Sequence, residues 1–197
     1  MRRVVSLMHM SLDGYVEGSN AEMDWIKIEE SVFAFVDRFI SRVGTALYGP
    51  KTFGMMEAYW PSVLDDATAT GHTMRHARWY ADAEKVVFSR SRTDLGGTSS
   101  SARLISGGNL AGELTALKQG EGKDIMIFGS PGLTHSCLEA GLVDEIVMTV
   151  SPVLLGAGTA MFPAGMSRTD LQLLEVVPFA AGSVGSHYRL AKAAGTA

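Results

Sequence analysis

The sequence predicts an α/β fold built around a mixed β-sheet, and two observations carry this prediction. Over most of the chain, short apolar segments typical of strands alternate with segments whose apolar residues recur at helical spacing. Near the C-terminus, Leu171 to Val177 and Val184 to Leu190 instead alternate like two adjacent antiparallel strands. A sheet built first from strand–helix units and then from a local strand pair is expected to be mixed.

Length and composition indicate a single globular domain. At 197 residues and 21.0 kDa the chain is long enough for one well-buried α/β core. We expect one domain over residues 1–192 and a tail over residues 193–197, because no repeat or long linker divides the chain. A net charge of −4 argues against a nucleic-acid partner, and one cysteine suits a reducing cytoplasm. No apolar run approaches the ~18 residues of a membrane span, so no membrane partner is expected.

The N-terminal third predicts two strand–helix units. We expect a first strand over residues 3–10, followed by a turn and a polar loop. Apolar residues at helical spacing predict a helix from Ile28 to Val43, which Gly44 ends. A second strand over residues 45–48 then leads into a helix that opens at Gly49-Pro50. We expect Tyr59-Trp60-Pro61 to close this helix, because the residue before a proline is pushed out of the helical region.

The segment from Lys123 to Leu142 is the clearest strand–turn–helix unit in the chain. Four consecutive apolar residues, Ile125 to Phe128, predict a buried parallel strand. Ser130 is a suitable N-cap and Pro131 suits the first helical position, so a helix should begin there. Cys137 belongs to the apolar stripe of this helix and is expected to pack in the core. The remaining expected elements are a partly helical stretch over 65–82, strands over 85–88, 102–105 and 145–150, an exposed loop over 93–101 and a helix over 109–118.

Three loops that follow three predicted strands could bind an anionic ligand together. They are Gly49–Thr52, Ser89–Ser91 and Gly129–Gly132. In an open α/β sheet, ligands lie outside the carboxyl ends of the strands, so these loops are expected to line one crevice. Two of them are glycine turns at helix starts, which can offer N–H groups to phosphates, and Arg90 suits a phosphate monoester.

Five sequence blocks in a fixed order carry a family resemblance. They are SLDGYV, YGPKTF, VVFSR, IFGSPGL and, from Val150 to Phe162, VSPVLLGAGTAMF. With these blocks the chain resembles the dihydrofolate-reductase-like family, and within it the reductase domain of bifunctional riboflavin-biosynthesis deaminase-reductases. The resemblance implies a three-layer fold with a central, mixed and mostly parallel sheet of about eight strands, flanked by helices and ending in antiparallel strands. It also implies NADPH as hydride donor and a homodimer.

The resemblance also implies roles for individual residues. Asp13 lies in a segment similar to the mobile loop beside the nicotinamide, which makes it the catalytic candidate. Ser89 and Arg90 correspond to the site of the adenosine 2′-phosphate. Ser130 stands where the family often has a glycine, which bears on how closely the backbone approaches a phosphate. The full set of implied cofactor-binding residues is Gly14, Gly49, Lys51, Thr52, Ser89, Arg90, Gly129, Ser130, Gly132 and Leu133, and the candidate substrate contacts are Trp25, Phe33 and Trp60.

The hypothesis that follows is an NADPH-dependent reductase acting on a small polar molecule. In the riboflavin branch of the family the substrate is 5-amino-6-(5-phosphoribosylamino)uracil; the linked deaminase is absent here, since neither H-x-E nor P-C-x-x-C occurs. One alternative is pterin reduction of the dihydrofolate reductase type. It needs a carboxylate near the start of the first long helix, where Glu29 and Glu30 are close but the register favours an apolar residue. Another alternative is a nucleotide-binding module without turnover.

Several polar residues are not expected to form sites. His72 and His76 are four residues apart, but no third ligand falls in register, so we expect no metal site. Asp37 lies opposite the apolar stripe of its helix and is expected to be solvated.

Overall fold

In the computed structural model, which describes residues 1–69, 71–96 and 102–191, eight strands form one sheet. Its strands are β1 (Val4–Ser11), β3 (Val43–Tyr48), β4 (Glu84–Ser89), β5 (Ala102–Ser106), β6 (Asp124–Phe128), β7 (Glu145–Ser151), β9 (Leu171–Pro178) and β10 (Val184–Leu190). They lie in the order β5-β4-β3-β6-β1-β7-β10-β9. The first six in this order are parallel, and β10 is antiparallel to both β7 and β9. The predicted mixed, mostly parallel sheet is confirmed.

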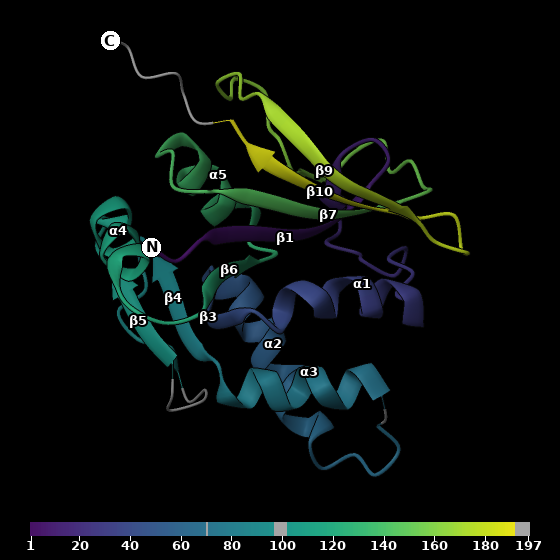
Figure 1. Ribbon diagram of the computed structural model, residues 1–197, viewed down its shortest axis with the longest axis horizontal. Coiled ribbons are helices and arrows are strands. Elements are labelled where there is room, and N and C mark those ends of the chain that lie inside the picture. The colour runs from purple at the N-terminus through teal and green to yellow at the C-terminus, as the bar shows by residue number, and fades with distance from the viewer. Residues whose placement is uncertain (70, 97–101, 192–197) are drawn as a thin grey trace.

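Helices cover both faces of the sheet and complete three layers (Figure 1). They are α1 (Glu30–Ile40), α2 (Pro50–Val63), α3 (Gly71–Asp82), α4 (Leu110–Gln119) and α5 (Pro131–Glu139). Side chains of α1, α2 and α3 share one hydrophobic core with Val5 and Leu7, whereas α4 and α5 share a second core with Val4. Neighbouring residues of a strand point to opposite faces, which is why one strand serves both cores. None of the helices in the described part of the chain has the length and apolar character needed to cross a bilayer.

Two predicted helix boundaries are wrong. The first helix ends at Ile40 rather than Val43, because Val43 already pairs with Asp124 as the first residue of β3. Helix α2 continues past Pro61 to Val63. Trp60 and Val63 are both buried, so packing of the last turn outweighs the backbone hydrogen bond that a proline cannot donate. The other predicted elements are present with ends shifted by a few residues, and residues 97–101 of the predicted exposed loop lie outside the described chain.

A second, two-stranded sheet was not predicted. It pairs β2 (Tyr15–Glu17) with β8 (Thr159–Ala160) and lies beyond the C-terminal end of β1. Gly158 is required for the close approach of these strands, since a Cβ there would lie 2.1 Å from the carbonyl oxygen of Glu17. Strands this short carry almost no periodic signal, so their pairing depends on contacts distant in sequence.

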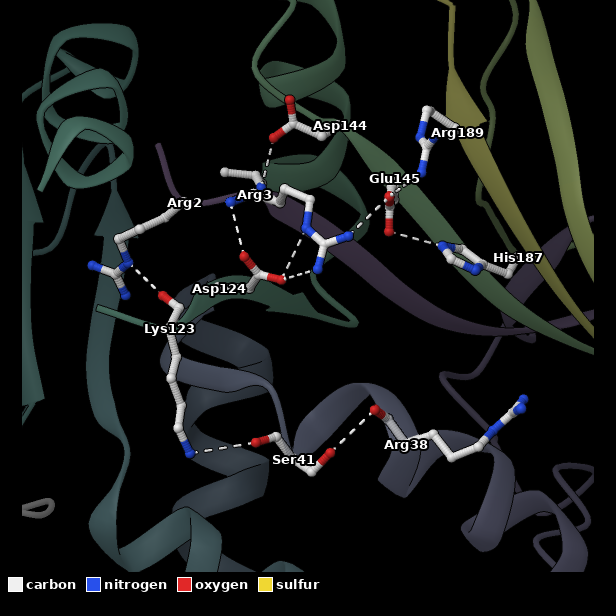
Figure 2. A network of polar contacts seen from close by, with 11 residues as sticks. Arg2, Arg3, Arg38, Ser41, Lys123, Asp124, Asp144, Glu145, His187 and Arg189 are labelled. Carbon is white, nitrogen blue, oxygen red and sulfur yellow. Dashed lines mark hydrogen bonds and ion pairs between the residues drawn. The ribbon is translucent and has the colours of Figure 1, made fainter. Parts of the chain in front are cut away.

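At the end of the sheet away from the small sheet, a network of ion pairs and hydrogen bonds links the starts of β1, β6 and β7 (Figure 2). Arg3 lies between two carboxylates, with Nη2 2.6 Å from Asp124 Oδ2 and Nη1 3.3 Å from Glu145 Oε1. Glu145 also accepts hydrogen bonds from His187 (2.9 Å) and Arg189 (3.2 Å) of β10. Burial raises the pKa of Glu145, but these hydrogen bonds and the charge of Arg3 outweigh it and hold the pKa below its ordinary value. The charged side chains at this end of the sheet therefore hold neighbouring strands together.

Candidate functional site

A cavity of about 850 Å³ opens at the C-terminal ends of β3, β4 and β6, and we call it the strand-end cavity. The loops that follow these three strands, Gly49–Thr52, Ser89–Ser91 and Gly129–Leu133, all contribute to its wall. The structure therefore brings the three predicted anion-binding loops to one place. Beyond them, the cavity extends between α1, α2 and the loop before α1, where its wall becomes largely apolar.

Two helix N-termini are fixed side by side at this cavity by hydrogen bonds around Ser130. The Gly49 N–H donates to Ser130 Oγ (2.9 Å), and the Ser130 N–H donates to Thr52 Oγ1 (3.2 Å). Ser130 Oγ in turn donates to the carbonyl of Phe128 (2.9 Å). Ser130 is the N-cap residue of α5, as predicted, but its side chain makes no cap bond, and the residue is left-handed with φ 52° and ψ 59°. Its hydroxyl braces α5 against α2 instead.

Both helix starts are open toward the cavity. The first turn of a helix leaves N–H groups without an intrahelical acceptor, and the helix dipole makes that end positive. Gly129 has φ 52°, and a Cβ there would lie 3.3 Å from Thr52 Cγ2, so glycine keeps this turn tight. A Cβ on Gly132 would meet nothing within 4 Å, which leaves space for a ligand at the first turn of α5.

The loop after β4 is a turn closed on Ser89. Its hydroxyl oxygen accepts from the N–H groups of Ser91 (3.3 Å) and Arg92 (2.9 Å). Arg90 is exposed and lines the cavity, and its side chain takes part in none of the ion pairs found among the described residues. A guanidinium without an ion-pair partner in the described chain, on a residue that lines the same cavity as two helix N-termini, is well suited to bind a phosphate.

The charge of Lys51 is already partnered. Its Nζ lies 2.5 Å from Glu17 Oε2, while Glu17 Oε1 accepts from Thr159 Oγ1 at 2.9 Å. The hydrogen bond from Lys51 is the main cause of the lowered pKa of Glu17. Glu17 also lines the cavity, and the sequence reasoning missed it because it lies on the unpredicted strand β2. Lys51 thus links α2 to the small sheet.

Among the described residues, the cavity wall does not include Asp13, Gly14 or Trp25. The carboxylate of Asp13 accepts hydrogen bonds from the backbone N–H groups of Leu155 (3.1 Å) and Gly156 (2.7 Å), and one from Ser11 Oγ (2.7 Å). The bond from Ser11 is the main cause of the lowered pKa of Asp13. These bonds hold the turn after β1 to the segment after β7.

The apolar part of the cavity wall contains Phe33 and Trp60, two of the candidate substrate contacts, and also His76. Sequence reasoning considered His76 only as a metal ligand. In the structure it stacks on Trp60, with ring centroids 3.9 Å apart, and burial lowers its pKa to about 4. His72, one turn earlier, instead contacts Asp37. Asp37 was expected to be solvated, but its carboxylate is engaged by this contact.

His9 of β1 is the other histidine in the wall. Burial lowers its pKa to about 4, and its Nδ1 contacts the hydroxyl of Thr149. Like His76, it is neutral at neutral pH. No feature of the local sequence identified either histidine as part of a site.

The donors at the strand-end cavity fit a dinucleotide cofactor. Two adjacent helix N-termini suit a pyrophosphate, the space beside Gly132 allows close approach, and Arg90 can reach a further phosphate. The adjoining apolar part leaves room for a second molecule next to the cofactor.

Comparison with known sequences places the chain in a protein family. Residues 2–184 match the model of a family described as RibD C-terminal domain. The uncharacterized protein YyaP from Bacillus subtilis (strain 168) is 30% identical over 184 residues, covering 93% of this chain and 92% of YyaP.

Solved structures confirm the dihydrofolate-reductase-like fold. The Thermotoga maritima diaminohydroxyphosphoribosylaminopyrimidine deaminase/5-amino-6-(5-phosphoribosylamino)uracil reductase aligns with a TM-score of 0.66 and 13% identity, over 96% of this chain and 57% of that one. The dihydrofolate reductase from Enterococcus faecalis complexed with NADP(H) and RAB-propyl aligns with a TM-score of 0.63 and 11% identity, over 96% and 97% of the two chains. At these identities the likeness shows the fold alone.

Proposed function

This chain belongs to the RibD C-terminal domain family, and from that premise we propose that it is an NADPH-dependent reductase of a small molecule. The convergence of three strand-end loops on one cavity is the observation that carries the proposal. When bound, NADPH supplies a hydride from C4 of its nicotinamide to an electrophilic carbon, and the atom doubly bonded to that carbon takes up a proton. The protein binds and orients the cofactor and the acceptor, and it excludes water from the path of the hydride.

Each part of the cavity has a proposed task in binding the cofactor. The N-termini of α2 and α5 hold the pyrophosphate through Gly49, Thr52, Gly132 and their neighbours, and Arg90 holds the adenosine 2′-phosphate. Ser130 contributes by fixing the two helix starts, because its own hydroxyl is engaged with Gly49 and Phe128.

For Asp13 we propose a positioning role in place of the catalytic role that the resemblance implied. Its carboxylate is occupied by backbone N–H groups of the segment after β7, and it lies outside the cavity wall. It would act on the reaction only by fixing the turn at Gly14, whose carbonyl accepts from the N–H of Met161 at 2.8 Å.

The acceptor named for the Thermotoga enzyme, 5-amino-6-(5-phosphoribosylamino)uracil, is one candidate substrate, to be compared with acceptors that carry no phosphate. Pterin reduction is less favoured, because α1 contributes only Val32, Phe33 and Val36 to the cavity. Neither Glu29 nor Glu30 is among the described residues of its wall.

Titration of the purified protein with NADPH, followed by cofactor fluorescence, tests the proposal. We expect saturable binding below millimolar cofactor and hydride transfer to a carbonyl or imine acceptor. Absence of saturable binding would refute the reductase. Tight binding without turnover of any acceptor would favour the nucleotide-binding module instead.

Two further properties stay proposals that depend on the sequence. The proposal of a homodimer rests on the family resemblance. The structure adds one supporting feature: on the edge strand β9, Leu173 and Val176 are 53% and 54% exposed. Exposed apolar residues on a sheet edge favour pairing with a second chain. Sedimentation at micromolar concentration should therefore give twice 21.0 kDa, and a particle of 21.0 kDa would refute the dimer. A cytoplasmic location rests on cysteine usage.

A further inference from the structure

The apolar part of the strand-end cavity constrains the chemistry of what binds beside the cofactor, and we call this part the acceptor chamber. It is formed by residues of α1, α2, α3 and the loop before α1. Its wall consists of Met23, Ile26, Ile28, Val32, Phe33, Val36, Met55, Met56, Trp60 and His76. Nine of these ten side chains are hydrocarbon, thioether or aromatic groups, and the tenth is a neutral imidazole.

The described residues place no free cation in this chamber. The charged side chains in the wall of the whole cavity are Glu17, Lys51 and Arg90. Lys51 is paired with Glu17, and Arg90 follows β4, at the end where the cofactor phosphates are proposed to bind. Lys27 lies between two wall residues in sequence, but it is not part of the wall and its Nζ donates to the carbonyl of Asp24 (3.2 Å).

A phosphorylated substrate would therefore bind poorly inside the chamber. Moving a charged group from water into an apolar site costs several kcal/mol or more unless a partner of opposite charge compensates. Enclosed phosphates are normally bound by arginine, lysine or helix N-termini. The helix N-termini that line this cavity are those of α2, α4 and α5, which follow β3, β5 and β6 and lie at the cofactor end.

His76 gives the chamber one polar contact. The residue is 7% exposed, and we find no hydrogen bond to its ring nitrogens among the described residues. Its ring is fixed by stacking on Trp60 and by an edge contact with Trp79 at 5.3 Å between centroids. The ring nitrogens of His76 are not among the fully buried atoms that lack a partner in the described chain, so they are accessible, and a ligand in the chamber can form a hydrogen bond with them.

We propose that the substrate is an uncharged molecule of aromatic character, without a phosphate, which fills the acceptor chamber and forms a hydrogen bond with His76. This inference rests on the proposed function, because the chamber is the acceptor site only if NADPH binds at the other end. Thioether and aromatic walls suit aromatic rings through close packing and sulfur–aromatic contacts. The proposal departs from the phosphorylated acceptor of the riboflavin branch.

A matched pair of probes that differ only in a phosphate group tests the proposal. We would titrate 2-naphthol and 2-naphthyl phosphate into the protein by calorimetry, with NADP⁺ saturating the cofactor end. We expect 2-naphthol to bind and the phosphate ester to bind on the order of 100-fold more weakly. Equal affinity for the two, tighter binding of the ester, or no binding of 2-naphthol would overturn the proposal.

Two variants and one control test separately the missing cation and the hydrogen bond from His76. Met55→Arg places a cation in the chamber at a residue that is 41% exposed, and should raise the affinity for the phosphate ester roughly tenfold or more. Tyr59→Arg adds the same charge one turn later on α2, outside the wall, and should leave that affinity unchanged. His76→Phe keeps an aromatic ring against Trp60 and should weaken 2-naphthol roughly tenfold. If His76→Phe has no effect, or if both arginine variants act alike, the chamber does not bind the probe as proposed.

The same experiment separates failure of this inference from failure of the reductase proposal. NADPH fluorescence is measured on each protein first. If NADPH does not bind, the reductase proposal fails whatever the naphthols do. If NADPH binds and the phosphate ester binds as tightly as 2-naphthol, only the inference about the substrate fails.

Discussion

At the scale of single residues, Arg90 is proposed to select the phosphorylated cofactor. Its guanidinium is exposed at the cavity and engages no carboxylate of the described chain, so it is available to the 2′-phosphate of NADPH. A charge-assisted hydrogen bond of this kind contributes about 1.5–3 kcal/mol. Arg90→Ala should therefore weaken NADPH roughly 10- to 100-fold, whereas NADH, which carries only a hydroxyl there, should bind nearly as before.

Dissociation constants for both cofactors, measured on wild type and variant, check this prediction. Arg92→Ala is the matched control, since Arg92 lies two residues later and is not in the cavity wall. The preference for NADPH should also shrink as salt is raised, because the contact is partly exposed. If the affinities for NADH and NADPH fall together, or if neither falls, Arg90 does not select the cofactor.

Ser130 combines an unfavourable backbone conformation with two hydrogen bonds made by its hydroxyl. Ser130→Ala leaves the Gly49 N–H and the Phe128 carbonyl without their partner, which should lower the free energy of unfolding by about 1–3 kcal/mol. Ser130→Gly loses the same bonds but relieves the left-handed strain at φ 52°, and should cost roughly 1 kcal/mol less. Urea denaturation measures both, and equal losses in the two variants would show that the strain is negligible.

At the scale of elements, the small sheet of β2 and β8 depends on Gly158. In Gly158→Ala the new Cβ would lie 2.1 Å from the Glu17 carbonyl oxygen and 3.0 Å from Gly18 Cα, so the strands must separate. Glu17 would then lose its bond to Thr159, and the support it gives Lys51 would weaken. Hydrogen exchange should become faster over residues 15–17 and 159–161.

Gly156→Ala is the control within the same segment. Gly156 also has a positive φ, 75°, but a Cβ there meets nothing within 4 Å. Gly156→Ala should therefore lower the free energy of unfolding by the backbone strain alone, roughly 1 kcal/mol, and leave hydrogen exchange in the small sheet almost unchanged. Equal exchange in the two variants would contradict a steric role for Gly158.

At the scale of the whole molecule, buried ionisable groups determine how stability depends on pH. His9 and His76 have a pKa of about 4 in the folded protein, against an ordinary value of 6.5. The unfolded chain therefore takes up protons first, and the free energy of unfolding should be full above pH 6.5 and fall as the pH drops toward 4. Glu145, whose pKa is lowered from 4.5, adds a further loss below pH 4.5.

Urea denaturation between pH 8 and pH 3 separates these two contributions. His76→Phe should make the curve less steep between pH 6.5 and 4, where His9 still contributes, and Glu145→Gln should make it less steep only below pH 4.5. Glu175→Gln, which breaks the exposed ion pair with Arg38, controls for the substitution of a glutamate. A wild-type curve that is flat from pH 6.5 to 4 would contradict the buried, neutral state of both histidines.

The sequence by itself indicated the strands of the large sheet, the helices, their order and the family, but not the exact helix ends. Apolar periodicity is a local property, so strands such as β6 and helices such as α5 could be located without a partner in view. Because parallel strands end at one edge of a sheet, it also predicted that the loops at Gly49, Ser89 and Gly129 would meet.

Only the tertiary structure decided which side chains face the cavity and which are already engaged. It placed His76 in the wall and Trp25 outside it, paired Lys51 with Glu17, and engaged Asp13 with backbone N–H groups far away in sequence. It also formed the small sheet, whose two strands are too short to show a pattern. The physical reason is the same in each case: these contacts join residues distant along the chain, and local propensity carries no information about them.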